Sequence, residues 1–217
     1  DRNSGTETIT NSGTIRTSGN NSHGFYSQTN SGTSTFTNSG TITTNGNWAI
    51  GVYSSANSGS ENLINSGTIT TSGDNGYGIY VHNNSGTSTL TNSETIKTIG
   101  VSSAGIHSLQ NSATETITNS GTITTSGTSA YGIESLSNSG TSTIISSGTI
   151  TASGQYGHGM YSYNQASGGT STFTNSGTIT TSDAYGLGIY SSTNSGTRTL
   201  TNSGTITTSG SSSRGIS

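Results

Sequence analysis

Large apolar side chains recur singly along this chain, each flanked by polar residues, and they return at constant intervals. The isoleucine of the repeated phrase Gly-Thr-Ile returns every 27 residues, apart from one interval of 29. Two other apolar positions keep the same spacings. The three series are Ile15, Ile42, Ile69, Ile96, Ile123, Ile150, Ile179 and Ile206; Phe25, Val52, Ile79, Ile106, Ile133, Met160, Ile189 and Ile216; and Ile9, Phe36, Leu63, Leu90, Ile117, Ile144, Phe173 and Leu200. A period of this size is the signature of a repeat architecture.

Each repeat contains three short stretches in which one apolar residue alternates with polar neighbours: Thr-x-Thr-Leu-Thr, Thr-Ile-Thr-Thr and Gly-Ile-Tyr-Ser. Period-two alternation is typical of strands with one buried face. Asn-Ser-Gly and Ser-Gly separate the stretches and indicate turns, because Gly and Asn tolerate positive φ. One repeat cannot fold alone, whereas stacked repeats share a core. We therefore predict an all-β fold, a parallel β-solenoid of eight 27-residue coils with three short strands per coil, right-handed as parallel crossovers normally are.

The repeats run through the whole chain, so we expect one solenoid array over residues 1–217, with a two-residue insertion between 161 and 172. Eight coils less one residue, without obvious polar caps, suggest an excerpt of a longer stalk or the protomer of a fibre. Unpaired strand edges favour self-association, end to end or along the rod.

Two columns of asparagine and one column of glycine follow the same period. Stacked asparagines are expected to form hydrogen-bonded ladders between coils. They are Asn3, Asn30, Asn57, Asn84, Asn111, Asn138 and Asn194, and Asn11, Asn38, Asn65, Asn92, Asn119, Asn175 and Asn202. The third column is a glycine that occurs in all eight coils from Gly24 to Gly215, which indicates positive φ or a close backbone approach.

An outward column of tyrosines is the first candidate binding surface. By alternation it faces solvent, where tyrosine either packs along the sheet or contacts a glycan or protein ligand. The candidate residues are Tyr26, Tyr53, Tyr80, Tyr161 and Tyr190. Residues that differ between repeats, such as Trp48, Tyr156, Tyr185 and the insert around Tyr163, are better candidates for specific recognition than the repeated phrases.

Paired threonines on the Gly-Thr-Ile-Thr strand are the second candidate surface. Flat Thr-x-Thr arrays on a solenoid resemble the ice-binding face of β-solenoid antifreeze proteins, although Arg16 and Lys97 interrupt this array. The candidate residues are Thr41, Thr43, Thr68, Thr70, Thr122, Thr124, Thr149, Thr151, Thr178, Thr180, Thr205 and Thr207.

Three glutamates, Glu7, Glu61 and Glu115, share one repeat position in alternate coils. Skipping a coil avoids like charges ~4.8 Å apart. Simple alternation from Ile9 places these side chains inside, but we expect the Asn-Ser-Gly corner to break the alternation and leave them outside.

The composition of the chain argues against several functions. Hydrophobic residues are 24% and charged residues 6% of the chain, against roughly 45–50% and 25% in globular domains. Net charge is −3 with only five Lys and Arg, which argues against nucleic-acid binding. No apolar run is long enough for a membrane span. Acids and histidines do not cluster at adjacent coil positions, so we expect no enzyme activity, no metal and no cofactor.

The phrase NSGTITTSG followed by GYGIY resembles the passenger regions of bacterial autotransporters and related repeat adhesins. That resemblance implies an extracellular setting on a bacterial cell surface. Our first hypothesis is a non-enzymatic structural and adhesive stalk or fibre. The alternatives are an ice-binding protein that uses the threonine file and a glycan-binding module that uses the tyrosine column.

Overall fold

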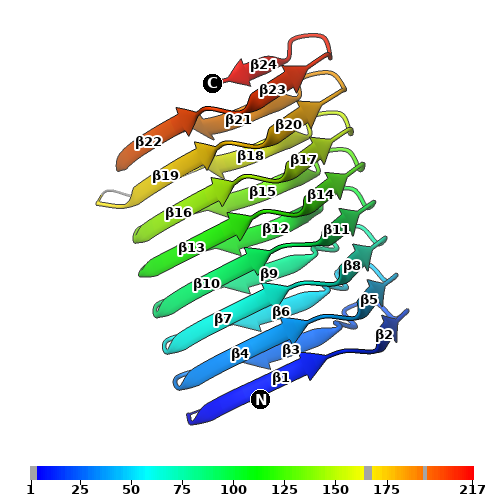
Figure 1. Ribbon diagram of the computed structural model, residues 1–217, viewed down its shortest axis with the longest axis vertical. Coiled ribbons are helices and arrows are strands. Elements are labelled where there is room, and N and C mark those ends of the chain that lie inside the picture. The colour runs from blue at the N-terminus through cyan, green and yellow to red at the C-terminus, as the bar shows by residue number, and fades with distance from the viewer. Residues whose placement is uncertain (1–3, 164–167, 193–194) are drawn as a thin grey trace.

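The computed structural model describes residues 4–163, 168–192 and 195–217, and these residues form 24 strands. The strands assemble into three eight-stranded parallel sheets, and each coil contributes one strand to each sheet. The coils stack along the long axis, with the N-terminal end of the chain at the bottom of Figure 1 and the C-terminal end at the top. The prediction of a parallel β-solenoid of eight coils with three strands each is confirmed.

The first sheet contains the six-residue strands of the Thr-x-Thr-Leu-Thr phrase. Its inward positions alternate with outward threonines, and its central apolar side chains stack in register, as Leu63 does on Leu90. The strands are β1 (Thr6–Asn11), β4 (Thr33–Asn38), β7 (Ser60–Asn65), β10 (Thr87–Asn92), β13 (Thr114–Asn119), β16 (Thr141–Ser146), β19 (Thr170–Asn175) and β22 (Thr197–Asn202).

The second sheet contains the four-residue strands of the Thr-Ile-Thr-Thr phrase. Its isoleucines point inward and its paired threonines point outward. The strands are β2 (Thr14–Thr17), β5 (Thr41–Thr44), β8 (Thr68–Thr71), β11 (Thr95–Thr98), β14 (Thr122–Thr125), β17 (Thr149–Ala152), β20 (Thr178–Thr181) and β23 (Thr205–Thr208).

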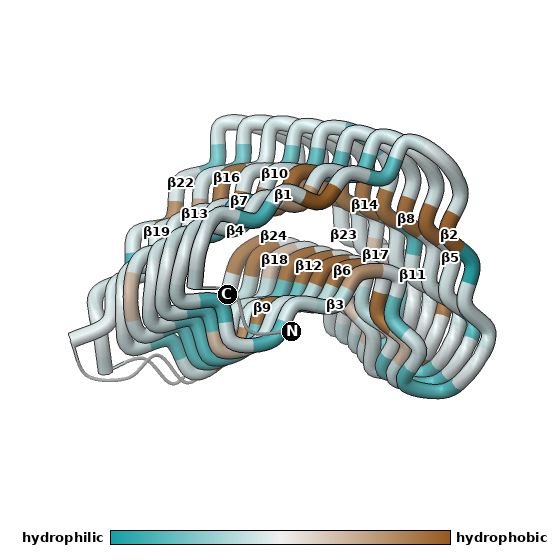
Figure 2. The backbone as a smooth tube through the Cα atoms, turned by 90° about the horizontal axis from the view of Figure 1, so that it is seen from below, coloured by the Kyte–Doolittle hydropathy of each residue, from teal (hydrophilic) through white to brown (hydrophobic). Residues whose placement is uncertain are grey.

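The third sheet contains the strands of the Gly-Ile-Tyr phrase and forms the side of the coil that faces the other two sheets (Figure 2). Its strands are β3 (Phe25–Gln28), β6 (Val52–Ser55), β9 (Ile79–His82), β12 (Ala104–Leu109), β15 (Tyr131–Leu136), β18 (His158–Tyr163), β21 (Leu187–Ser192) and β24 (Arg214–Ile216).

The three apolar series meet between the sheets as one continuous core, and their columns are the brown bands of Figure 2. In the middle coils these side chains are fully buried, as Ile106, Ile117 and Ile123 show. In the outermost coils the equivalent residues, such as Ile9 and Leu200, are only partly buried because a neighbouring coil covers them on one side. Stacking therefore supplies the burial that a single coil lacks.

The glycine before each third-sheet strand is required by close packing. A Cβ on Gly78 would lie 2.4 Å from Cγ2 of Ile96 and 2.5 Å from the carbonyl oxygen of Gly105. We expected glycine and asparagine of the Asn-Ser-Gly turns to adopt the left-handed backbone conformation. That conformation is found instead at other turn positions, among them Trp48 (φ 57°) and Tyr156 (φ 58°). Close approach, one of the two explanations offered for this glycine column, is therefore the correct one.

Asparagine ladders form as predicted. Within the ladders the side-chain amide of one asparagine donates to the amide oxygen of its equivalent in the next coil, at 2.7 Å from Asn65 to Asn92 and 2.8 Å from Asn84 to Asn111. Ser146 replaces asparagine in one ladder, and there Asn119 donates to a hydroxyl at 3.3 Å. The ladder positions Asn3 and Asn194 lie outside the described residues.

The expectation that the glutamates face outward is wrong. Glu61 and Glu115 are buried in the core, whereas Glu7 in the first coil is half-buried. β7 and β13 begin at Ser60 and Thr114, one residue before each buried glutamate, so these side chains belong to the strand and follow its simple alternation. We call the inner positions Glu7, Ser34, Glu61, Ser88, Glu115, Ser142 and Ser171 the Glu–Ser file.

The strand register shows where the repeat lengthens. Tyr163 pairs with Leu136, 27 positions earlier, whereas Thr170 pairs with Thr141, 29 positions earlier. The two extra residues therefore fall between β18 and β19, in a segment whose residues 164–167 lie outside the described part of the chain.

Candidate binding face

Aromatic and histidine side chains gather on one side of the solenoid. All ten tyrosines, the four histidines and the single tryptophan lie in the third sheet or in the turns that flank it. The outward positions of the first and second sheets are mostly threonine. We call this side the aromatic face, and it is the strongest candidate for recognition.

A local departure from alternation makes this face two columns wide. Gly78 and Ile79 both point inward, since the Cβ position of Gly78 is directed at Ile96 of the second sheet. Tyr77 and Tyr80, on either side of this pair, are therefore both on the outer side, and their rings lie 5.1 Å apart. The same step in other coils brings Tyr131 beside Tyr161, with ring centroids 4.7 Å apart.

The predicted tyrosine column is present and faces outward, but its rings cover one another. Tyr53 and Tyr80 stack at 5.0 Å with an angle of 6° between their planes, and Tyr161 stacks on Tyr190 at 5.5 Å. Most of the column is half-buried, and only Tyr26 in the first coil is largely exposed. The column consequently presents ring edges and hydroxyl groups, because the ring faces are occupied by neighbouring rings.

His107 and Glu134 interrupt the tyrosine column, and both side chains are buried. Nδ1 of His107 lies 2.5 Å from Oε2 of Glu134, an ion pair when the imidazole is protonated. The rings of Tyr77 and Tyr80 pack against His107 at 4.6 and 4.8 Å. Burial, followed by the charge of Glu134, raises the pKa of Tyr131 to about 12, and the same two causes raise the pKa of Tyr77. These phenols therefore remain protonated hydrogen-bond donors at physiological pH.

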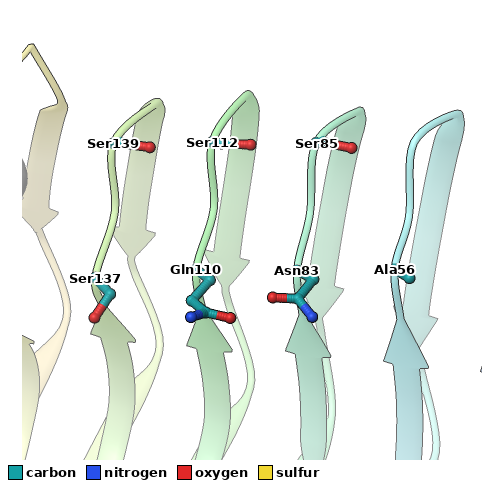
Figure 3. Close-up of a pocket in the computed structure, with 7 residues that line it drawn as sticks. All are labelled: Ala56, Asn83, Ser85, Gln110, Ser112, Ser137 and Ser139. Carbon is teal, nitrogen blue, oxygen red and sulfur yellow. The ribbon is translucent and has the colours of Figure 1, made fainter.

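Surface hollows lie along the turns and on the aromatic face within the described part of the chain. One, of about 590 Å³, runs across four coils between the third and first sheets and is lined by uncharged polar side chains and Ala56 (Figure 3). The hydroxyls of Ser85 and Ser112 lie in one row there, and each donates to the backbone of the preceding coil. This hollow offers neither an aromatic ring nor a charge to a ligand.

Two smaller hollows lie on the aromatic face itself. One, of about 430 Å³, is lined by residues that include His158, Tyr190 and Arg214. The other, of about 270 Å³, lies beneath Trp48. Trp48 and Tyr185, which line these two hollows, were predicted from the sequence as candidates for recognition. The sequence analysis did not predict that the aromatic face also includes His23, Tyr77, Tyr131 and His158. These four residues share one repeat position, three residues before the tyrosine column, and that shared position could have indicated a second aromatic column.

The threonine file lies on the outer side of the second sheet, in register from coil to coil. Thr43 pairs with Thr70, and exposed Lys97 stands between Thr70 and Thr124 in the same row. Ice binding by this file stays a prediction, which thermal hysteresis and ice-crystal shaping would test.

Across residues 4–163, 168–192 and 195–217, no group of three or more His, Asp or Glu side chains is placed to hold a metal ion. Within the same ranges no helix is long and apolar enough to cross a membrane.

The stacked sheets and the aromatic face define this chain as a β-solenoid repeat domain. Residues 81–216 match the family described as BigA third pectate lyase-like domain. Because this match spans more than half of the chain, the chain belongs to that family. No curated protein and no solved structure matches the chain.

Proposed function

We propose that this chain is a non-enzymatic structural and adhesive segment of a stalk or fibre on a bacterial surface. The observation that carries the proposal is the unbroken register of all three sheets over eight coils. The hydrogen bonds between coils run along the rod, so separating two coils requires breaking all three sheets at once. Asparagine ladders add side-chain hydrogen bonds in the same direction.

The surface setting draws on two findings. Membership of the BigA third pectate lyase-like family supports a bacterial surface protein. The repeated NSGTITTSG phrase, which resembles autotransporter passengers and repeat adhesins, supports a stalk outside the cell. The outermost strands then pair with a further coil, of the same chain or of a second copy.

The absence of catalysis is part of the proposal. The carboxylates of Glu61 and Glu115 lie inside the solenoid, and Glu134 contacts His107. The carboxylate of Asp74 accepts the backbone N–H of Val101 at 2.9 Å. General acid–base chemistry needs a pair of groups that reach one substrate, and these acids are engaged separately.

Electron microscopy of the native surface material tests the structural role. Rods or filaments are expected, with a repeat along the axis of ~4.8 Å in diffraction. Compact capped monomers in the native material would contradict the proposal. Incubation with polygalacturonate tests the catalytic part, because a lyase leaves an unsaturated product that absorbs ultraviolet light, and its appearance would overturn the non-enzymatic assignment.

A further inference from the structure

We propose that the hollow beneath Trp48 binds an uncharged pyranose unit of a glycan. This inference names a ligand class for the adhesive role proposed above and rests on it. Trp48 occupies the turn between β5 and β6, and the hollow extends from its indole towards Tyr53, Tyr80 and His82.

The first support is the free ring of Trp48. Every tyrosine and histidine of the chain has a ring neighbour with its centroid within 6.4 Å, whereas Trp48 has none in the described ranges. Its side chain is 52% exposed. Its backbone is fixed in the left-handed conformation, and its N–H donates to the carbonyl oxygen of Asp74 at 2.9 Å. A flat apolar surface is thus present at the hollow without a neighbouring aromatic ring to cover it.

The second support is the arrangement of polar atoms. Nδ1 of His23 accepts the N–H of Ile50 at 3.2 Å, which leaves Nε2 of His23 as a hydrogen-bond donor. Nε2 of His82 lies 3.2 Å from the side-chain oxygen of Gln110, to which it donates, so Nδ1 of His82 is an acceptor. The hollow therefore combines donors and acceptors with aromatic surface. A pyranose matches this combination, because its C–H groups pack on a ring while its hydroxyls take hydrogen bonds.

The third support is the absence of charge. None of the residues that line the hollow is an acid, a lysine or an arginine. Burial lowers the pKa of His23, which favours its neutral form at physiological pH. A charged ligand would lose water there without gaining an opposite charge. The volume, about 270 Å³, lies just below the roughly 300–1,000 Å³ of pockets for drug-sized ligands, which suits one sugar ring.

Trp48 is the only tryptophan of the chain, so its fluorescence reports on this hollow directly. The full chain is titrated with neutral methyl pyranosides of gluco, galacto and manno configuration and with their oligosaccharides. A saturable change in emission with at least one of them is expected. No saturable change with any neutral sugar, or tighter binding of a uronic acid or of a peptide, would overturn the proposal.

Variants locate the site. His82→Ala keeps the fluorophore and should weaken binding about tenfold, a loss of about 1.4 kcal/mol. Trp48→Ala should abolish the binding of the same sugar in calorimetry. Tyr156→Ala is the matched control, because Tyr156 occupies the same turn position with φ 58° and is exposed but lies outside the hollow. This control should bind within twofold of the parent chain, and equal binding by Trp48→Ala would place the sugar elsewhere and contradict the proposal.

The two proposals fail separately. Circular dichroism confirms that each variant keeps its strands, and electron microscopy of the parent material tests the rod. Rods without sugar binding would remove only the ligand assignment, whereas sugar binding by a capped monomer would remove only the stalk.

Discussion

Two of the polar columns buried in this solenoid stack in different ways. The asparagine ladders repeat the same residue in consecutive coils, with amide hydrogen bonds of 2.7–3.0 Å. The Glu–Ser file alternates two residues, and serine donates to glutamate over 3.5 Å at Glu61 and 3.3 Å at Glu115. An amide carries both a donor and an acceptor, so it can bond to its own copy above and below.

An ionised carboxylate only accepts, and a copy of itself is a repulsive neighbour. Burial raises the pKa of Glu61 to about 7, and the hydroxyls of Ser54 and Ser88 oppose the shift only in part. The pKa of Glu115 rises to about 6 for the same main reason. The difference teaches that a solenoid tolerates a buried polar residue in every coil only where that residue is complementary to itself.

The largest effect is expected from Ser88→Glu, which places three glutamates in consecutive coils, since Ser88 pairs with Glu61 on one side and with Glu115 on the other. Carboxylates ~4.8 Å apart repel by about 3 kcal/mol per pair at an effective dielectric constant of about 20. The variant should lose at least that much of its free energy of unfolding at pH 8 relative to Ser88→Gln, measured by urea denaturation. Below pH 4 the two should agree, and a gap that persists there would contradict the electrostatic explanation.

Asn65→Ala should be the next most damaging change. It removes the middle of a ladder and leaves Asn38 without its acceptor and Asn92 without its donor. Two unsatisfied buried groups imply a loss of about 2–4 kcal/mol in the free energy of unfolding. Asn65→Ser, which imitates the natural Ser146, should lose less. Equal stability of Asn65→Ala and the parent chain would show that the ladder does not hold the coils together.

Glu61→Gln should stabilise the chain at alkaline pH. Burial raises the pKa of Glu61 in the folded chain to about 7, against an ordinary value of about 4.5, so the unfolded chain ionises first as pH rises. The parent chain therefore loses about 3 kcal/mol more stability than the variant by pH 8, whereas the contribution of Glu115, whose pKa is also raised, is common to both chains. The gap should close below pH 4. His158, whose pKa burial lowers to about 4, titrates in both chains and cancels in the comparison. A gap that is independent of pH would point to packing instead.

The smallest effect is expected from Ser146→Asn, which joins two separate parts of one ladder. Asn119 would then donate to an amide oxygen and the new amide would donate to Asn175, whose Oδ1 has no donor among the described residues. A gain of about 0.5–1.5 kcal/mol in the free energy of unfolding is expected. Ser147→Asn, at the exposed next position, is the control and should change little.

The fold was predictable because a 27-residue period fixes which residues stack, whatever the details of the turns. The inward apolar columns and the asparagine ladders followed from that period alone. The direction of Glu61 was predicted wrongly because the Asn-Ser-Gly corner was expected to break the alternation, whereas β7 starts at Ser60 and alternates regularly from there.

The second column of the aromatic face was missed for a related reason. Strict alternation puts Tyr77 on the inner side with Ile79, but Gly78 and Ile79 both face the core. A glycine can point inward beside an isoleucine because it has no side chain to accommodate. The hollow beneath Trp48 depends on residues of three successive coils, which the pattern of one repeat does not describe.

The turn position of Trp48 has a consequence for how such a protein can change. In successive coils this left-handed position holds asparagine, tryptophan, asparagine, serine, serine, tyrosine, tyrosine and serine, and the backbone is the same in each. Seven of these eight residues are asparagine, serine or tyrosine, which also dominate the binding loops of antibodies. Each coil therefore has a turn position at which a substitution can change the surface that a ligand contacts. The fold of the array does not change, because the backbone at this position is the same in every coil.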